Sequence, residues 1–194
     1  MLPALIVFAV LGGAPESPLA VVKEGSAQVQ KMLAGKDATV ERLAAKADDF
    51  VDFAELAKRA LGKEWEKLAR KQQEDFSQTM KGLLRASYAH KALKDGRGGA
   101  NFTFDSESVS GDDAEVVTTL VLKEDKVPVV YRLYRAGAKG WRVYDVVTDE
   151  VSLVATYNDQ FRKLIASKGY EGLLSALKSK RAELEKPAAS AGTN

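Results

Sequence analysis

The segment that most constrains the fold of this chain runs from Gly140 to Phe161 and reads GWRVYDVVTDEVSLVATYNDQF. Its first part, up to Val147, is rich in aromatic and β-branched residues, which is typical of a β-strand. From Leu153 onward the apolar residues recur at the spacing of a helix. Because the period changes from two to about 3.6 within a few residues, the strand must lead directly into an amphipathic helix. The sequence therefore predicts a sheet-to-helix corner that is closed on one side.

The composition excludes several classes of protein. A chain of 194 residues, 45% apolar and 29% charged, has the make-up of one soluble globular domain with a sizeable core. Its formal net charge of +2 is too small to suggest a nucleic-acid partner. The chain has no cysteine, which excludes disulfides, thiolate zinc sites and cysteine nucleophiles.

The sequence offers no catalytic constellation. His90 is the only histidine, so neither a zinc site nor a Ser-His-Asp triad has enough partners, and the chain contains no G-x-S-x-G motif. The glycines from Gly96 to Gly99 follow a helix and precede a strand, which is the reverse of a phosphate-binding loop. We therefore expect a protein that is not an enzyme and needs no metal or other cofactor.

Periodicity and turn signals predict an α+β fold. Short turns rich in glycine and aspartate separate the expected strands, so these should form hairpins and a four-stranded antiparallel sheet packed against several helices. The strands are expected at residues 101–109, 114–122, 127–135 and 141–148, and the helices at residues 17–35, 39–62, 63–93, 151–167 and 170–184.

The second and third strands have one apolar face, which should meet the helices. A turn over residues 123–126 would pair Leu120 with Val129 and Thr118 with Tyr131. The face that these residues share continues through Val116 and Leu133, whereas the opposite face is mixed and is expected to be partly exposed.

The two ends of the chain differ from the rest. Residues 2–11 are apolar and have the length of a signal-peptide core, and Gly12 to Ala14 supply a small-x-small cleavage pattern. We expect a signal peptide over residues 1–20, one ligand-binding domain over 21–184 and a disordered tail over 185–194. A buried N-terminal strand or helix is the alternative for the first segment.

Three blocks of the sequence together resemble one known family. They are the W-x-V-Y-D-V-x-x-(D/E)-x-V-S-L block with its Y-x-x-Q-F helix, the DFVDFAELAKRALGKEW segment, and the helix from Gln72 to Leu93. This order is similar to that of the MlaC family, the periplasmic phospholipid-carrying component of ABC lipid-transport systems, also called the toluene-tolerance auxiliary family. The chain departs from the family at Glu150, where Gly is usual, and at Asn158, where Arg is frequent.

The resemblance implies an apolar ligand cavity with a phospholipid as cargo, and a monomer located in the periplasm. It also implies two partners, an inner-membrane ABC transporter complex and an outer-membrane lipoprotein complex, and a role in the lipid asymmetry of the outer membrane. We expect the cavity wall to come from the sheet and the corner, with the lipid-binding residues Val116, Thr118, Leu120, Val129, Tyr131, Leu133, Tyr144, Val146, Val154, Tyr157 and Phe161.

The residues themselves leave a second interpretation open. A packed core and a hollow one use the same apolar pattern, so a non-enzymatic interaction or structural domain with a filled core fits the sequence as well. A small-molecule enzyme is the third interpretation. Only the family resemblance favours the cavity at this point.

Overall fold

The computed structural model describes residues 17–36, 38–96, 100–122 and 125–185. Its elements are α1 (Pro18–Ala34), α2 (Val40–Ala47), α3 (Phe53–Leu61), a 3₁₀ turn (Gly62–Lys67), α4 (Arg70–Gly96), β1 (Ala100–Ser110), β2 (Asp113–Leu122), β3 (Asp125–Arg135), a second 3₁₀ turn (Gly137–Lys139), β4 (Trp141–Thr148), β5 (Val151–Ser152) and α5 (Leu153–Leu184). The strands form one antiparallel sheet in the order β1-β2-β3-β4-β5.

The predicted α+β class is confirmed, but the sheet has five strands and not four. The additional strand, β5, is only two residues long and pairs with the end of β4 through Val147–Ser152 and Thr148–Val151. Its residues were expected to begin the helix. They are strand because the chain folds back on β4 in a two-residue turn before the helix starts at Leu153.

Side chains that accept hydrogen bonds from free backbone amides set the starts of four helices. The hydroxyls of Ser17, Thr39 and Ser152 accept from the amides of residues 20, 42 and 155 at the starts of α1, α2 and α5. Asp52 does the same for α3, with its carboxylate accepting from two amides. The expected helix over 63–93 begins later, at Arg70, because Gly62 has a positive φ of 62° and residues 62–67 form a 3₁₀ turn instead.

The register between β2 and β3 differs from the predicted one. Thr118 lies opposite Val129, so its predicted pairing with Tyr131 is wrong by two residues. The two strands stay paired as far as Leu122 and Asp125, so the connection is two residues shorter than the turn that was assumed. A shift of two residues leaves each side chain on its original face. The prediction that this face meets the helices is confirmed, because Thr118 and Val129 are buried.

β4 contains a bulge that shifts its inward-facing positions by one residue. Asp145 lies opposite Arg132 and Val143 opposite Leu133, which leaves Tyr144 as the additional residue. Val143 packs in the core before the bulge, and Val146 packs against the same cluster after it. The bulge therefore brings the Asp145 carboxylate to the point where the chain turns toward α5.

The Asp145 carboxylate holds the sheet-to-helix corner together. It is 1% exposed and accepts hydrogen bonds from the Val146 and Val154 amides at 2.9 and 3.0 Å and from the Ser152 hydroxyl at 2.6 Å. The Arg132 guanidinium lies 3.4 Å from the same carboxylate. One buried side chain thus fixes the end of β4, the strand β5 and the first turn of α5 relative to one another.

The apolar side chains form three separate clusters instead of one continuous core. The largest joins α3, α4 and α5 around Phe76 and Phe161, whose rings meet edge to face at 5.6 Å. A second joins α1 to the inner face of the sheet around Val22 and Val116. A small third one joins α1, α2 and the end of α4 around Leu43.

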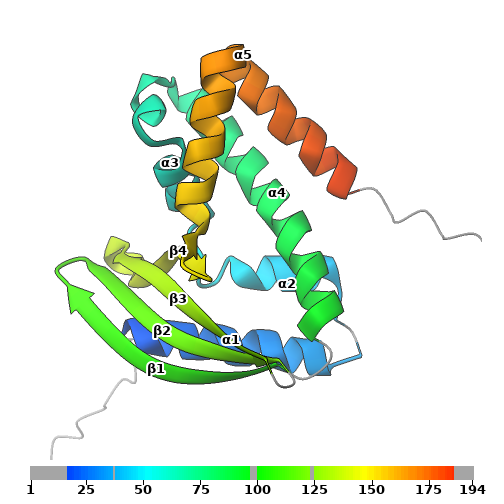
Figure 1. Ribbon diagram of the computed structural model, residues 1–194, viewed down its shortest axis with the longest axis vertical. Coiled ribbons are helices and arrows are strands. Elements are labelled where there is room, and N and C mark those ends of the chain that lie inside the picture. The colour runs from blue at the N-terminus through cyan, green and yellow to red at the C-terminus, as the bar shows by residue number, and fades with distance from the viewer. Residues whose placement is uncertain (1–16, 37, 97–99, 123–124, 186–194) are drawn as a thin grey trace, which may run out of the picture.

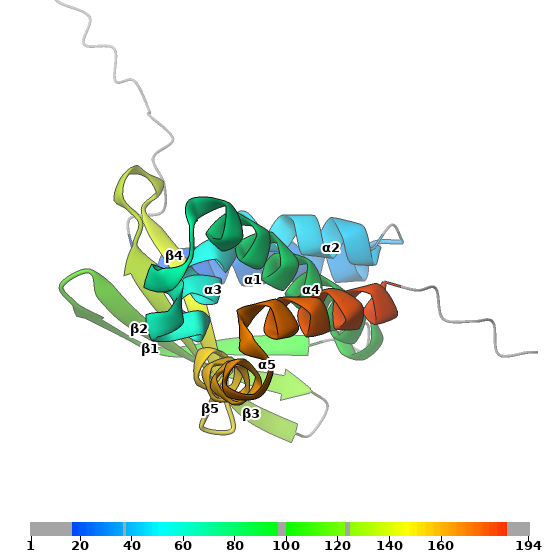
Figure 2. The same ribbon diagram turned by 90° about the horizontal axis from the view of Figure 1, so that it is seen from above.

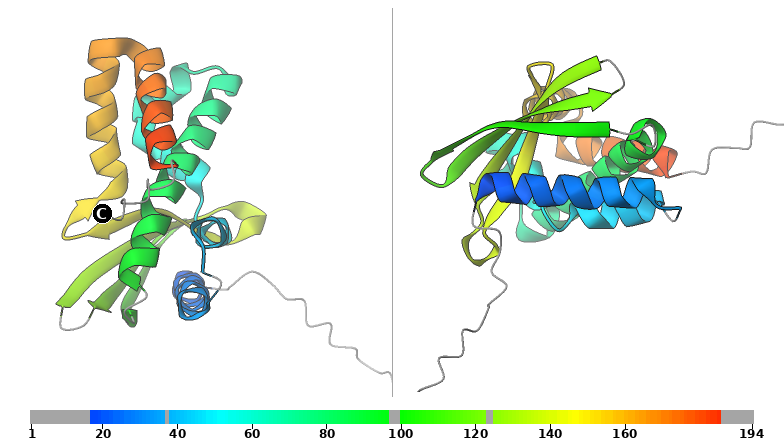
Figure 3. Two further views of the ribbon diagram at one scale, coloured as in Figure 1. Left: turned by 90° about the vertical axis from the view of Figure 1, so that its right-hand side faces the viewer. Right: turned by 90° about the horizontal axis from the view of Figure 1, so that it is seen from below.

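Figures 1 to 3 show how the helices and the sheet that contribute to these clusters are arranged. In Figure 1 the helices α3, α4 and α5 stand above the sheet, and α5 turns back on itself at its upper end, where Gly169 has non-helical angles. Figure 2 shows the second half of α5 leading away from the first half. In Figure 3 α1 and α2 lie side by side at the base of the molecule, and α1 runs across the sheet.

The corner allows a first prediction, on Asp145. Replacement by Ala would remove the acceptor of two partly buried amides and one hydroxyl, at about 1–3 kcal/mol each. We expect Asp145→Ala to lower the free energy of unfolding by about 3 kcal/mol or more, measured by denaturant titration. The control is Asp159→Ala, an exposed position on α5, which should change the free energy by less than about 0.5 kcal/mol. Equal stability of the two variants would show that the carboxylate does not hold the corner.

A second prediction concerns the turn between β4 and β5, which consists of Asp149 and Glu150. Both residues have positive φ, 49° and 63°, a conformation that costs about 1 kcal/mol or more for a residue with a Cβ atom. We expect Glu150→Gly to raise the free energy of unfolding by about 1 kcal/mol, because Asp-Gly suits this type of two-residue turn. Ser108→Gly, in the exposed part of β1, is the control and should be destabilising. A destabilised Glu150→Gly protein would contradict this account of the turn.

Candidate functional site

A cavity of about 510 Å³ lies where the three apolar clusters meet but do not merge. Each cluster contributes to its wall, with Leu56 and Leu84 from the first, Tyr131 and Val146 from the second, and Leu43 from the third. The volume is within the range of pockets that hold small organic ligands. The side chains of this chain therefore leave a hollow core.

The helices form one side of the cavity. The wall residues that they contribute are mostly aliphatic, and they include Val29, Leu43, Ala44, Leu56, Leu84 and Ala92. The chain between α2 and α3 closes the gap between these helices and β4. Ala47 at the end of α2, Val51 in this connection and Phe53 at the start of α3 also line the cavity.

The sheet and the corner form the other side, through Tyr131, Val146, Thr148, Val151, Leu153 and Thr156. Val146 and Leu153 are sequence neighbours of Asp145 and Ser152, so the hydrogen bonds of the corner also position the wall. Val151 is 57% exposed and Tyr88, on α4, is 49% exposed, although both line the cavity. These two side chains thus mark where the apolar wall reaches the surface.

Residues 48–52 attach the helical wall to β4. The Asp52 amide donates to the Val143 carbonyl at 2.8 Å, and the Val143 amide donates to the Phe50 carbonyl at 2.9 Å. The Asp52 carboxylate accepts from the Tyr134 hydroxyl at 2.6 Å. Burial by itself would raise the pKa of Asp52, but the hydrogen bonds from Tyr134 and from the backbone amides lower it overall. This side of the cavity is therefore held by backbone and side-chain bonds together.

Arg85 is the one formally charged side chain among the lining residues. Its guanidinium is paired with the Asp48 carboxylate, which also accepts from the Lys81 ammonium at 2.9 Å. One carboxylate therefore neutralises only one of two cations, which leaves a positive charge beside the apolar wall. The Nε of Arg85 and Oδ1 of Asp48 are buried and have no hydrogen-bond partner.

Tyr131 has the clearest electrostatic signature in the cavity. Its ring lies on the inner face of β3, and burial raises the pKa of its hydroxyl to about 12. An ionised phenolate is disfavoured there because the surroundings offer it little solvation. The surroundings of Tyr131 are therefore apolar enough to disfavour ionisation of its hydroxyl.

The predicted lipid-binding residues occupy different places. Tyr131 and Val146 lie in the cavity wall. Four others on the inner face of the sheet are buried in its packing and do not line the cavity, namely Val116, Thr118, Val129 and Leu133. Leu120 is partly buried on β2. For these residues, contact with a ligand stays a prediction.

The remaining four predicted residues lie at the corner. Val154, Tyr157 and Phe161 pack into the cluster of α3, α4 and α5. Tyr144, the bulge residue, stacks under the Arg59 guanidinium, 3.7 Å from its ring centroid. None of the four is among the residues that line the cavity, because Tyr144 lies at the bulge and the other three side chains point toward neighbouring helices.

Sequence analysis did not identify the helical half of the wall. Val29, Leu43, Leu56 and Leu84 belong to regular apolar stripes, which the sequence assigns to a packed core. A stripe of this kind has the same pattern whether it faces another helix or a hollow. The one local signal was Arg85, a charge beside the stripe of α4.

Two further classes of site are not found in the described part of the chain. It contains no group of three or more His, Cys, Asp and Glu side chains that could hold a metal ion. No helix within residues 17–36, 38–96 and 125–185 combines the length and the apolar character needed to cross a membrane.

Comparisons with known proteins agree with this architecture. The family model of the MlaC protein matches residues 17–179, so the chain belongs to the MlaC family and the resemblance is confirmed. The fold is similar to that of the phospholipid-binding protein from Ralstonia solanacearum, whose structure was solved in complex with a phospholipid. The TM-score is 0.78 at 25% identity, over 87% of this chain and 98% of that one. No curated protein is significantly similar in sequence.

A prediction on Tyr131 tests whether the cavity wall is as apolar as its lining indicates. Because the folded state holds the Tyr131 proton more tightly than the unfolded state does, this residue does not affect the free energy of unfolding below its unfolded pKa of 10.0. As the pH rises from there toward about 12, the free energy of unfolding falls. We expect a difference titration of tyrosinate absorbance between the wild type and Tyr131→Phe to place this ionisation near pH 12. In the variant the corresponding alkaline loss of stability should be absent. Ionisation near pH 10.0 with an intact fold would show that water reaches the hydroxyl.

Proposed function

We propose that this chain is a periplasmic phospholipid carrier of an ABC lipid-transport system. The observation that supports it most is the apolar cavity of about 510 Å³ within a chain of the MlaC family. The likeness to a phospholipid-binding protein solved with its lipid supports the same class of ligand. A filled interaction domain, the alternative from the sequence, accounts for none of this volume.

The physical need for such a carrier follows from the hydrophobic effect. Two acyl chains of about sixteen carbons hold roughly 25 kcal/mol of hydrophobic free energy in water, at about 0.8 kcal/mol per methylene. A free phospholipid therefore leaves a bilayer too rarely to cross an aqueous compartment. A carrier whose interior is nearly as apolar as the bilayer brings the transfer close to neutral in both directions.

Near-neutral loading also explains why the carrier needs partners and no chemistry of its own. The direction of lipid transport must come from an external energy source, which in this proposal is an inner-membrane ABC complex. An outer-membrane lipoprotein complex would be the partner at the other end of the path. The carrier has to offer an apolar wall, an opening and docking surfaces. We accordingly propose a binding protein and not an enzyme, with the lipid as cargo and not as cofactor.

At roughly 30 Å³ per methylene, the cavity of about 510 Å³ has room for about seventeen carbons, so only part of the two acyl chains would occupy the space between the helical wall and the sheet. Tyr131 and Val146 would touch them, while Val116 and Leu133 would support the wall from behind. The head group would remain near the exposed side chains of Tyr88 and Val151. Arg85, one turn before Tyr88 on α4, would be the nearest cation to a phosphate among the lining residues.

A substitution that occupies the cavity tests this function. Ala47 lines the cavity at the end of α2, whereas Ala45 is exposed on the same helix. We expect organic extracts of gently purified wild type and Ala45→Trp to contain diacyl phospholipid at a fixed molar ratio, measured by mass spectrometry. Displacing only two methylenes costs about 1.6 kcal/mol, so Ala47→Trp should bind lipid about tenfold more weakly or worse.

Thermal unfolding of both variants checks that they are folded. Wild-type protein without any bound phospholipid, and without uptake from added vesicles, would contradict the proposed function and favour an interaction domain. Full lipid content in a folded Ala47→Trp protein would instead place the lipid outside this cavity.

A further inference from the structure

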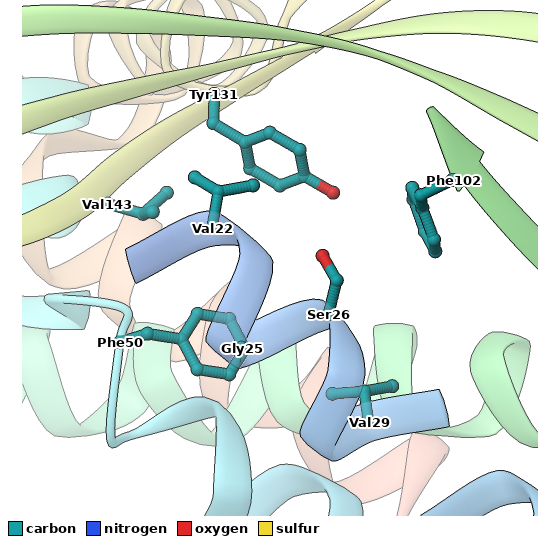
Figure 4. A pocket seen from close by; sticks show the side chains of 8 residues that line it. All are labelled: Val22, Gly25, Ser26, Val29, Phe50, Phe102, Tyr131 and Val143. Carbon is teal, nitrogen blue, oxygen red and sulfur yellow. The ribbon is translucent and has the colours of Figure 1, made fainter. Parts of the chain in front are cut away.

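A second, smaller hollow of about 100 Å³ lies between α1 and the inner face of the sheet (Figure 4). Its floor is α1, through Val22, Gly25, Ser26 and Val29. Phe50 closes one end, because its ring lies so near to Gly25 that a Cβ atom there would be 2.9 Å from the ring. We call this hollow the α1 chamber.

The α1 chamber adjoins the main cavity. Phe102, Tyr131 and Val143 form its wall toward the sheet. Val29 and Tyr131 line both hollows, so these two side chains stand between them. In Figure 4 the Tyr131 ring reaches from the sheet toward α1, and its hydroxyl and that of Ser26 both point into the chamber. A change in the Tyr131 side chain would therefore connect the two volumes.

No hydrogen bond within the described part of the chain fixes Tyr131 in this position. Its hydroxyl is without a partner there, and so is the hydroxyl of Ser26. Both residues are only partly buried, and a ring whose hydroxyl makes no hydrogen bond has none to break when it turns. The partition between the two hollows thus consists of one aromatic side chain and one valine.

We propose that the α1 chamber is a subsite for the methyl end of an acyl chain, entered from the main cavity past Tyr131. This inference rests on the proposed function and adds a determinant of chain length. A methylene group needs about as much room as a water molecule, roughly 30 Å³, so the chamber has space for about three carbons. Apart from the two hydroxyls its lining is apolar, which suits the end of a chain and not a head group.

A filling variant tests the subsite. The side chain of Ser26 points into the chamber, and leucine at this position would occupy most of its volume while favouring the helix more than serine does. Ala27→Leu places the same side chain on the exposed face of α1 and is the matched control. Both proteins are loaded from vesicles with a series of phosphatidylglycerols that differ only in chain length, and the bound lipids are quantified by mass spectrometry.

We expect Ser26→Leu to prefer chains about three carbons shorter than the wild type does, and to bind the longest chains more than about tenfold more weakly. Ala27→Leu should keep the wild-type preference. Tyr131→Ala, which removes the aromatic part of the partition and leaves Val29, should shift the preference toward longer chains. If Ser26→Leu does not fold, Ser26→Val fills less of the chamber and should give a smaller shift in the same direction.

The outcomes separate this inference from the proposed function. A wild-type protein that takes up none of the phosphatidylglycerols overturns both. Lipid uptake with one and the same chain-length preference in the wild type, Ser26→Leu and Tyr131→Ala overturns the inference alone. In that case the chamber is a void or holds a water molecule between the two hydroxyls.

Discussion

The arrangement of the whole molecule depends on the buried carboxylate of Asp145. It satisfies two backbone amides and one hydroxyl at the point where the sheet ends and α5 begins. These donors belong to β4, to β5 and to the first turn of α5, so one group fixes the angle between the sheet and the long helix. α5 in turn packs against α3 and α4 in the apolar cluster around Phe161. Together with the hydrogen bonds of residues 48–52 to β4, this corner sets the distance between the helical layer and the sheet.

That distance explains why the molecule is hollow. The helices α3, α4 and α5 complete a cluster of their own, and α1 separately covers the sheet around Val22 and Val116. The apolar side chains of each cluster are buried within their own cluster. Their burial therefore does not require the two clusters to pack against each other across the remaining space. The segment of residues 48–52 bridges them with backbone bonds to β4, which keep the wall in place without filling it. The cavity is thus held by hydrogen bonds at the corner and at residues 48–52, and its wall reaches the surface at Tyr88 and Val151.

Much of the fold could be predicted from local patterns. The change of period near Ser152 gave the corner, and the apolar face of β2 and β3 was assigned correctly although their register was wrong by two residues. Side-chain alternation depends only on the parity of the register, which a shift of two does not alter. The strand β5 was missed because two residues are too few to show any period. Glu150, the departure from the family pattern, proved to occupy a left-handed turn position, where glycine is favoured for a reason of backbone geometry.

The sequence by itself determined the class of fold, the family and the lack of a cysteine or histidine-rich site, because composition, periodicity and motifs are local properties. Only the tertiary structure decided which apolar residues surround a space. Leu56 and Leu133 have the same chemistry and both continue regular apolar patterns, yet Leu56 lines the cavity and Leu133 is packed behind it. The difference lies in what each side chain faces, and that is set by the angle between layers that are far apart in the sequence. A hollow core is a property of the distances between clusters, which no single segment encodes.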